Sequence, residues 1–380
     1  ALATPFAPDA VPNSSLGLRR VHDNQAHRDG VELLTAWPHS VESSGEPSAE
    51  PTVEVASAPL RILIAGHDLK FAATAMQHVR DQGHELLIDQ WENHSQHDEE
   101  RSRGLLRQAD VIWCEWGLGN LEWYSQHKLP HQRLVGRVHS QELRRPFLAA
   151  VRHENVDAYV FVGELIRQAA VISHGVPLAK THVVPNPVAV EALDLPKTED
   201  AAHTLGLVGI VPRTKRLDLA LDVLEDLLSH DERYRLRVKG RRPDDYPWMS
   251  QRPDEMNWYA EQDERIRHLN ERHPDAVILD GYSDDMPSWY QNIGVALSVS
   301  DFESFHLTIA DGAASRALPV CLAWPGADLV YPESWLVTDT ADMVDAILRP
   351  RVTAEEARSA AILRFTDTVV LDRICLLYTS

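Results

Sequence analysis

The chain has 380 residues, 44% of them hydrophobic, and a formal net charge of −20 at pH 7. This length is too great for one hydrophobic core of ordinary size, so two domains are expected. The acidic balance argues against a nucleic-acid partner, and no apolar run of about 18 residues predicts a transmembrane segment. Peripheral contact with a membrane through a local basic patch stays open.

The number and spacing of the cysteines indicate the cellular compartment of the protein. Cys114, Cys321 and Cys375 are an odd number of cysteines at unrelated spacings. Such a pattern is typical of free, mostly buried thiols in a reducing environment. We therefore expect a cytoplasmic protein.

Residues 1–59 are rich in Pro, Ser, Ala and Glu and lack a sustained hydrophobic period, so a disordered leader is expected there. Alternating strands and helices are predicted beyond it. The strands are predicted over 60–66, 84–89, 110–114, 132–138 and 158–162, and the first helices over 70–82 and 98–108. This alternation predicts a parallel sheet covered by helices on both faces.

A second series of strands and helices follows a boundary near Pro187. The stretch from Thr181 to Pro187 predicts a short strand that ends in two prolines, and polar, acidic residues follow it. Further strands are predicted over 205–211, 234–239, 276–279, 293–299 and 318–322, and helices over 217–228, 261–272, 341–348 and 354–365. An insertion rich in Asp, Arg, Pro and Trp is expected over 241–257. The chain ends in the apolar run Leu376 to Ser380 without a stop signal, and we treat residues 371–380 as a doubtful or truncated tail.

The stretch from Ser300 to Gly312 carries the strongest functional signal. A predicted strand turns there into a helix, which leaves backbone N–H groups free at the positive end of the helix dipole. Such a turn binds anions and hydroxyls. Glu303 and Asp311 frame it. Because carboxylates repel phosphate, we expect these two acids to bind the hydroxyls of a sugar and a ribose.

This spacing resembles the Glu-x7-Glu signature of retaining glycosyltransferases of the family 4-like group, also called glycosyl transferases group 1. The resemblance covers about residues 60–365. It implies the GT-B fold, in which two Rossmann-like α/β domains with parallel sheets face each other across a cleft. It further implies an acceptor domain over 60–187 and a nucleotide-sugar donor domain over 188–370. Two residues depart from the family pattern: Asp311 replaces the second Glu, and Arg316 replaces a small residue.

The resemblance also implies an activity. A sugar would move from a nucleoside-diphosphate sugar to a glycan or small-molecule acceptor, such as a cell-envelope or exopolysaccharide glycan. Apart from the donor substrate no cofactor is expected. No metal is expected either, because cations and helix ends hold the diphosphate in this fold.

A basic turn precedes the predicted helix over 217–228. Arg213, Lys215 and Arg216 follow Gly209 closely, and cations at a helix start neutralise a diphosphate well. By the resemblance, Lys215 contacts the donor diphosphate. The family's Arg is replaced by Ile210, so Arg213 or Arg216 must supply the second cation. A solvated basic turn without function is the alternative interpretation.

The resemblance implies roles for further residues. Glu303 and the backbone around it would orient the donor sugar, and Gly281 and Tyr282 would lie beside the base. His139, assigned to catalysis together with Lys215 and Glu303, would face the cleft and contact the donor sugar or the acceptor. The acceptor would meet the loop after the first strand. The residues implied on the donor side besides these are Ser304, Phe305, His306 and Leu307, and those on the acceptor side are His67 and Lys70. Ordinary turns and a surface histidine are the alternatives for Gly281 and His139.

Other functions fit the sequence less well. No G-x-G-x-x-G follows the first strand, which argues against a tightly bound dinucleotide, and neither G-x-S-x-G nor a P-loop is present. His94 and His97 have metal-like spacing but stand in a polar loop, where solvated side chains are expected. A catalytically weakened sugar-nucleotide-binding or complex-forming subunit and a sugar-nucleotide epimerase of the same fold stay open as alternatives.

Overall fold

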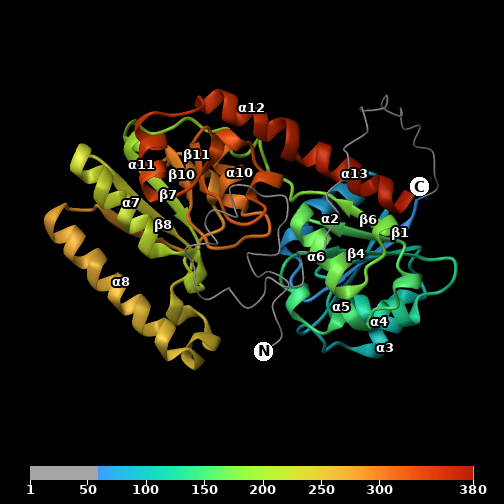
Figure 1. Ribbon diagram of the computed structural model, residues 1–380. Coiled ribbons are helices and arrows are strands. Elements are labelled where there is room, and N and C mark those ends of the chain that lie inside the picture. The colour runs from blue at the N-terminus through green and yellow to red at the C-terminus, as the bar shows by residue number, and fades with distance from the viewer. Residues whose placement is uncertain (1–58, 380) are drawn as a thin grey trace.

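The computed structural model describes residues 59–379, so the leader predicted over 1–59 lies outside the described residues except for Pro59. The described chain forms two lobes, each built on a parallel six-stranded sheet (Figure 1). The first sheet has the order β2-β1-β3-β4-β5-β6 and the second the order β12-β11-β10-β7-β8-β9. The predicted α/β architecture with two parallel sheets is therefore confirmed.

The strands of both sheets are short. Those of the first lobe are β1 (Arg61–Gly66), β2 (Glu85–Gln90), β3 (Val111–Cys114), β4 (Arg133–Val138), β5 (Ala158–Phe161) and β6 (Thr181–Val183). Those of the second lobe are β7 (Thr204–Val208), β8 (Arg235–Lys239), β9 (Val277–Gly281), β10 (Val295–Ser298), β11 (Leu318–Leu322) and β12 (Leu336–Val337). The strands β3, β5 and β10 are buried along their whole length, as expected for central strands covered by helices on both faces.

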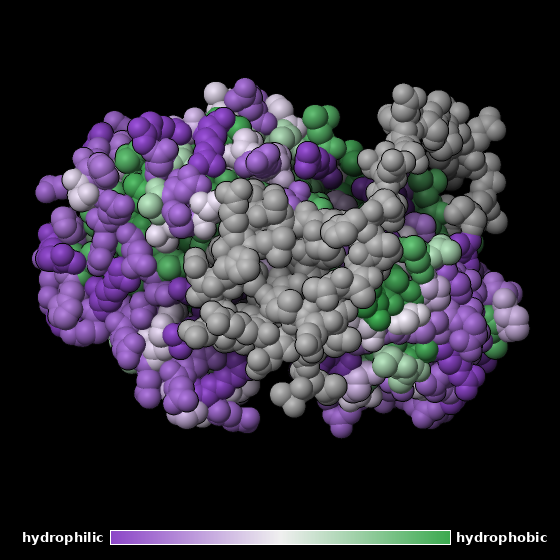
Figure 2. Space-filling view, viewed as in Figure 1, coloured by the Kyte–Doolittle hydropathy of each residue, from purple (hydrophilic) through white to green (hydrophobic). Residues whose placement is uncertain are grey.

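Helices cover the faces of both sheets. The first lobe has α2 (Ala73–Asp81), α3 (Glu99–Leu106), α4 (Gly119–His127), α5 (Phe147–Ala150) and α6 (Glu164–His174). The second lobe has α7 (Leu217–His230), α8 (Pro253–Arg272), α9 (Met286–Tyr290), α10 (Leu307–Ala314), α11 (Thr340–Leu348) and α12 (Ala354–Phe365). Figure 2 shows that the visible face of the second lobe is mostly hydrophilic, in keeping with the acidic composition.

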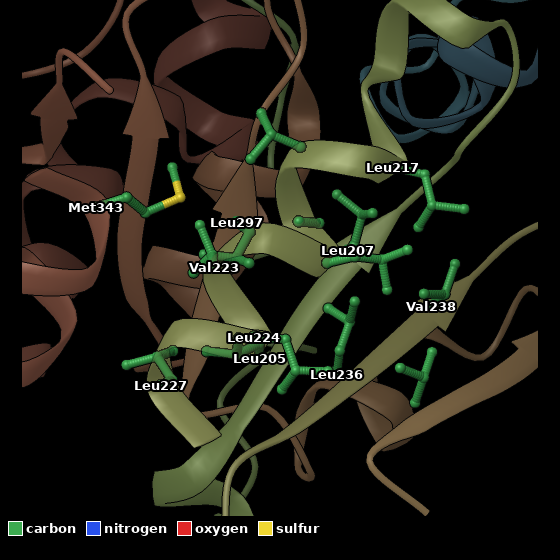
Figure 3. Packing of buried hydrophobic residues seen from close by; sticks show 14 of the residues in the cluster. Leu205, Leu207, Leu217, Val223, Leu224, Leu227, Leu236, Val238, Leu297 and Met343 are labelled. Carbon is green, nitrogen blue, oxygen red and sulfur yellow. The ribbon is translucent and has the colours of Figure 1, made fainter. Parts of the chain in front are cut away.

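The core of the second lobe fixes the position of its sheet edge. Helix α7 directs leucines at helical spacing, among them Leu217, Leu224 and Leu227, onto the leucines and valines of β7 and β8 (Figure 3). These residues are fully buried, so each contributes about 1.5–3 kcal/mol of hydrophobic stabilisation. This packing holds the turn between β7 and α7, which contains the predicted diphosphate-binding residues, at a defined place on the lobe.

Helix α8 begins earlier than predicted. The sequence pattern predicts a helix over 261–272 after an insertion, but the helix begins at Pro253. Proline fits the first helical turn because its missing N–H is not needed there, and Asp254 and Glu255 favour the positive end of the helix dipole. The prediction of an irregular segment up to residue 257 was therefore wrong for its last five positions.

The chain crosses back to the first lobe at its end. Helix α12 packs on α10, Thr366 forms a bridge with Val188, and α13 (Asp367–Thr379) packs on α2 (Figure 1). Leu371 and Ile374 of α13 are buried in the core of the first lobe. Residues 371–379, which were predicted as a doubtful tail, thus lie in a helix that ties the two lobes together. Within residues 59–379 no helix combines the length and the apolarity needed to cross a membrane.

Candidate active site between the two lobes

Two strand–helix turns of the second lobe meet at one sheet edge. Strands β7 and β10 are neighbours, so the turns that follow them lie side by side. Lys215 comes from the first turn and Glu303 from the second, and the Lys215 ammonium donates a hydrogen bond of 2.5 Å to Oε1 of Glu303. Their side chains are only 23% and 12% exposed. The structure therefore brings together the two residues predicted to hold the two halves of a sugar nucleotide.

Glu303 is ionised in this setting. Burial would raise its pKa, but the Lys215 ammonium, the nearby His306 ring and the hydrogen bonds together hold the pKa below its usual value. One of these hydrogen bonds comes from the Ser300 hydroxyl at 2.7 Å. A buried carboxylate with fixed donors on one oxygen can accept sugar hydroxyls with the other.

His306 starts α10 in a strained conformation. Its φ of 57° lies in the left-handed region, which a residue with a Cβ seldom adopts. The ring lies 2.6 Å, through Nδ1, from the hydroxyl of Ser298, and burial lowers its pKa to about 4, so the ring is neutral at pH 7. The hydroxyl of Tyr331 donates to the carbonyls of Phe305 and His306 at 2.7 and 2.9 Å. Tyr331 therefore stabilises the turn, a role that sequence reasoning missed.

The other residues predicted in this turn take different places. Ser304 directs its carbonyl toward the first lobe, as described below, and Phe305 packs in the core of the second lobe. Leu307 begins α10 and packs, half-buried, against the same core. The backbone of this turn, rather than these side chains, is what faces the first lobe.

Arg213 and Arg216 are both engaged by protein groups. The Arg216 guanidinium pairs with Asp218 and Asp301, each at 2.9 Å. Burial would lower the pKa of Arg216, but its hydrogen bonds to these carboxylates raise it. The Arg213 guanidinium lies over the ring of Trp258, 5.1 Å from its centre. Of these three basic residues, Lys215 is the one whose side chain bonds to Glu303.

Asp311 lies near the crossing between the lobes. Burial and then the charge of Asp367, at the start of α13, raise the pKa of Asp311 to about 7. Arg316, the other departure from the family pattern, has a φ of 63° at the end of the same helix, which explains why a glycine suits this position. Ion pairs with Asp194 and Glu355 hold its side chain.

The residues predicted beside the base lie at the end of β9. Gly281 has a φ of 67° and open space around its Cα. Tyr282 follows it, 61% exposed, and its hydroxyl donates to Asp284. The pKa of the Tyr282 phenol is raised, chiefly by Asp284 and to a smaller extent by Asp68 of the first lobe.

The residues predicted on the acceptor side form a cluster around Trp116. The ring of His139 lies 4.1 Å from the ring of Trp116, and His139 is buried, with its backbone N–H bound to Glu142. The ring centre of His67 lies 6.2 Å from that of Trp116 and 4.5 Å from that of His94, with which it makes an edge-to-face contact. Burial, then the charge of His94, lowers the pKa of His67.

Two predictions about this region have different outcomes. Lys70 is exposed and pairs with Asp68 at 3.1 Å, so it stands at the rim of the histidine cluster. His94 and His97, predicted as solvated loop residues, are instead half-buried: His94 contacts His67, and His97 stacks on Trp91 at 3.8 Å. The rings of His67, Trp91 and Trp123 cover these two histidines. Among the described residues no group of three or more His, Cys, Asp or Glu is arranged to hold a metal ion.

The Glu303 turn lies against the first lobe. A Cβ built on Gly163, just before α6, would lie 2.8 Å from the carbonyl oxygen of Ser304. The Arg144 guanidinium, which follows the His139 loop, lies 6.0 Å from the ring centre of Phe302, and burial lowers its pKa. The site is therefore placed between the lobes, with the predicted donor residues on one side and the His139 loop on the other.

Comparison with known proteins bears on the family of the second lobe and on the fold. Residues 202–350 match the family model described as glycosyl transferases group 1. The chain has the GT-B fold. None of the curated proteins matches it in sequence.

Solved GT-B structures resemble the chain in fold at low sequence identity. HepE of Anabaena, solved in complex with UDP, has a TM-score of 0.63 and 12% identity over 84% of this chain and 99% of HepE. A UDP-forming α,α-trehalose-phosphate synthase from Burkholderia xenovorans gives 0.63 and 12%, over 84% of this chain and 99% of the synthase. TarM gives 0.54 and 15% over 71% of this chain, and the chain spans only 55% of the length of TarM.

Proposed function

We propose that this chain is a retaining glycosyltransferase of the family 4-like group, which moves a sugar from a nucleoside-diphosphate sugar to a hydroxyl acceptor. The contact between Lys215 and Glu303 carries the proposal. It joins a cation suited to a diphosphate and a carboxylate suited to sugar hydroxyls at the carboxyl edge of a parallel sheet, where open α/β sheets bind ligands. The match of residues 202–350 to glycosyl transferases group 1 supports it.

The proposed reaction is a same-face substitution at the anomeric carbon. The bond from this carbon to the diphosphate oxygen breaks, and its electron pair stays on that oxygen. The acceptor hydroxyl attacks from the same face, and its proton passes to the leaving diphosphate. Lys215 stabilises the negative charge that grows on the diphosphate, while Glu303 and the backbone of Phe305 and His306 orient the sugar. The protein then needs no nucleophile of its own.

The acceptor side is assigned to the cluster around His139 and His67. Both histidine rings lie beside the ring of Trp116, and the exposed Lys70 lies at the edge of this cluster. Imidazole rings and an indole suit a hydroxyl-rich acceptor, such as a glycan, because they offer single hydrogen bonds and an apolar face. The free thiols of Cys114, Cys321 and Cys375 support a cytoplasmic location.

The experiment that tests the proposal combines binding and turnover. UDP-sugars and GDP-sugars are titrated calorimetrically, UDP-sugars first because similar structures were solved with UDP. Release of nucleoside diphosphate is then measured with and without a panel of glycan acceptors, and the product anomer is assigned by NMR. Transfer with retained configuration supports the proposal. An inverted anomer contradicts the retaining mechanism, and absence of binding to any sugar nucleotide contradicts the proposal as a whole.

A second candidate function is a sugar-nucleotide-binding subunit with weakened catalysis. Asp311 is one methylene shorter than the family's Glu and is neutralised in part at pH 7, since its pKa is raised to about 7. Ile210 removes the family's Arg, and Arg213 and Arg216 already contact protein groups. Donor binding without turnover for any acceptor would favour this candidate. Release of an isomerised free sugar without acceptor would instead identify an epimerase.

A further inference from the structure

Lys239 is a buried lysine at the ligand-binding edge of the second sheet. It ends β8, which lies between β7 and β9, and only 7% of its surface is exposed. Leu236 and Val238 of the same strand pack into the core beneath α7 (Figure 3). Because strand residues alternate between the two faces, Lys239 lies on the opposite face, together with Arg237.

Within the described part of the chain, the charge of the Lys239 ammonium helps to lower the pKa of Asp280 and of Asp285. No hydrogen bond or ion pair within 4 Å is formed by the ammonium among residues 59–379. The two nearby acids are already engaged: Asp280 accepts from Arg237 at 2.6 Å and from Trp289 at 2.7 Å, and Asp285 caps the start of α9. Because both acids are bound to other groups, the Lys239 ammonium can donate directly to a ligand that supplies oxygen acceptors.

The backbone around Lys239 is open to such a ligand. Three glycines with positive φ, which we call the glycine ledge, stand at the ends of three adjacent strands: Gly209 after β7, Gly240 after β8 and Gly281 at the end of β9. No heavy atom lies within 4 Å of a Cβ built on Gly209 or Gly281. Backbone hydrogen bonds of 2.8 Å, from Gly209 to the Lys239 carbonyl, and 2.9 Å, from Gly240 to the Gly281 carbonyl, hold the ledge together.

A register irregularity between β8 and β9 marks the same place. Val238 pairs with Leu279 but Lys239 pairs with Gly281, so Asp280 is the extra residue. Bulges of this kind are frequent beside binding sites, because they redirect a side chain and bend the strand end. Here the bulge turns Asp280 toward Arg237 and Trp289, which leaves the Lys239 ammonium for another acceptor.

We propose that Lys239 binds the nucleoside diphosphate part of the donor, which would lie on the glycine ledge and extend toward Lys215. This inference rests on the proposed function and adds a residue to its donor site. Lys239 would supply the second cation that the basic turn lacks, since Arg213 is held over Trp258 and Arg216 is paired with carboxylates. Lys215 would meet the phosphate nearer the sugar, and Lys239 the nucleoside side of the molecule.

The test compares Lys239→Met and Lys239→Gln with the wild type. UDP, GDP and ADP are titrated calorimetrically into each protein, and the unfolding midpoint without ligand is measured. We expect the nucleotide that binds the wild type to bind each variant about 10- to 100-fold more weakly, because a charge-assisted hydrogen bond is lost. The midpoint should change little, because neither variant loses a direct hydrogen bond or ion pair of the Lys239 side chain with residues 59–379.

Lys197 provides a matched control in the same lobe. It is half-buried, and its ammonium already donates to the carbonyls of Tyr290 and Ile293 and to the hydroxyl of Ser315. Lys197→Met should lower the unfolding midpoint without changing nucleotide affinity. Wild-type nucleotide affinity in both Lys239 variants would overturn the inference. If the unfolding midpoint also fell, the role of Lys239 would be to stabilise the charges of Asp280 and Asp285. If the wild type binds none of the three nucleotides, the proposed function itself fails.

Discussion

The Lys215 ammonium lies 2.5 Å from Oε1 of Glu303, although the two residues stand 88 positions apart in the chain. Each comes from a turn between a strand and a helix, and the two strands are neighbours in the sheet. The pair is mostly shielded from water, so its attraction is stronger than that of a surface ion pair. A ligand with a phosphate on one side and hydroxyls on the other can contact both charges at once.

Replacing Lys215 should reduce the catalytic rate strongly and the stability of the fold only moderately. Lys215→Ala removes the cation that we assign to the leaving diphosphate, and loss of such a group typically costs about 2.7–4 kcal/mol in the transition state. We therefore expect kcat to fall by about 100- to 1000-fold in a donor hydrolysis or transfer assay. Because Glu303 loses its partner, the free energy of unfolding should also fall, by about 1–3 kcal/mol.

Two controls make this test specific. The double variant Lys215→Met with Glu303→Gln has no unpaired charge, so it should regain stability and remain inactive. Arg267→Ala removes an exposed ion pair with Glu264 on α8 and should leave turnover unchanged. Activity near the wild-type level in a folded Lys215→Ala protein would contradict the role assigned to Lys215.

Gly163 tests whether the lobes must approach closely for turnover. A Cβ at this position would meet the Ser304 carbonyl at 2.8 Å, and the φ of −159° imposes no strain on alanine. Gly163→Ala should therefore push the Glu303 turn away from the first lobe and lower kcat more than it lowers the affinity of the second lobe for UDP. Parallel kinetics and calorimetry measure the two effects.

The matched glycine substitution is Gly104→Ala on α3. A Cβ there would meet only the Arg107 guanidinium, at 4.0 Å, and alanine favours the helix. This variant should keep full activity and gain slightly in stability. Equal turnover in Gly163→Ala and Gly104→Ala would show that the contact between Gly163 and Ser304 is irrelevant to catalysis.

Tyr331 should act on the site through the backbone. Its hydroxyl bonds to the carbonyls of Phe305 and His306, and it holds His306 at a positive φ. Tyr331→Phe leaves two buried carbonyls without this donor, which should cost about 1–3 kcal/mol of unfolding free energy in urea denaturation. Donor affinity should fall with it, because the turn relaxes. A loss of stability with unchanged donor affinity would limit Tyr331 to a structural role.

The sequence pattern predicted what depends on local chemistry. The alternation of strands and helices gives two parallel sheets, and turns that follow neighbouring strands of one sheet must meet at one edge. On this basis Lys215 and Glu303 could be assigned to the same sheet edge, although the sequence did not reveal that their side chains would be in direct contact. The start of α8 was misplaced because Pro253, Asp254 and Glu255, which form its first turn, were taken for insertion residues.

What the sequence did not predict depends on packing between distant segments. Gly163 resembles any glycine before a helix, and only the approach of the second lobe makes it special. Tyr331 stands in an irregular segment without a motif, and its hydrogen bonds reach 25 and 26 positions back. Lys239 ends an ordinary strand pattern, and its burial follows from neighbouring loops. The helix over 367–379 owes its place to contacts with α2 across the molecule.

Asp311 predicts a pH dependence of donor binding. Burial and the charge of Asp367 raise its pKa to about 7, so the carboxyl is protonated at pH 6 and ionised at pH 8. An ionised carboxylate accepts hydrogen bonds from ribose hydroxyls more strongly than a neutral acid does. UDP-glucose, a test donor, has no phosphate group that titrates between these pH values. Its affinity should therefore rise from pH 6 to pH 8 and level off above the pKa of Asp311.

The stability of the fold should change in the opposite direction. Because the folded pKa lies above the unfolded value, the protonated form favours folding, and this contribution is complete below the unfolded pKa and lost as the pH rises toward 7. Asp311→Asn stays neutral throughout, so it should abolish both the affinity change and this part of the stability change. Calorimetry at four pH values from 6 to 8 provides the measurement. A wild-type affinity that is flat over this range, or an Asp311→Asn protein that keeps the slope, would show that Asp311 does not touch the donor.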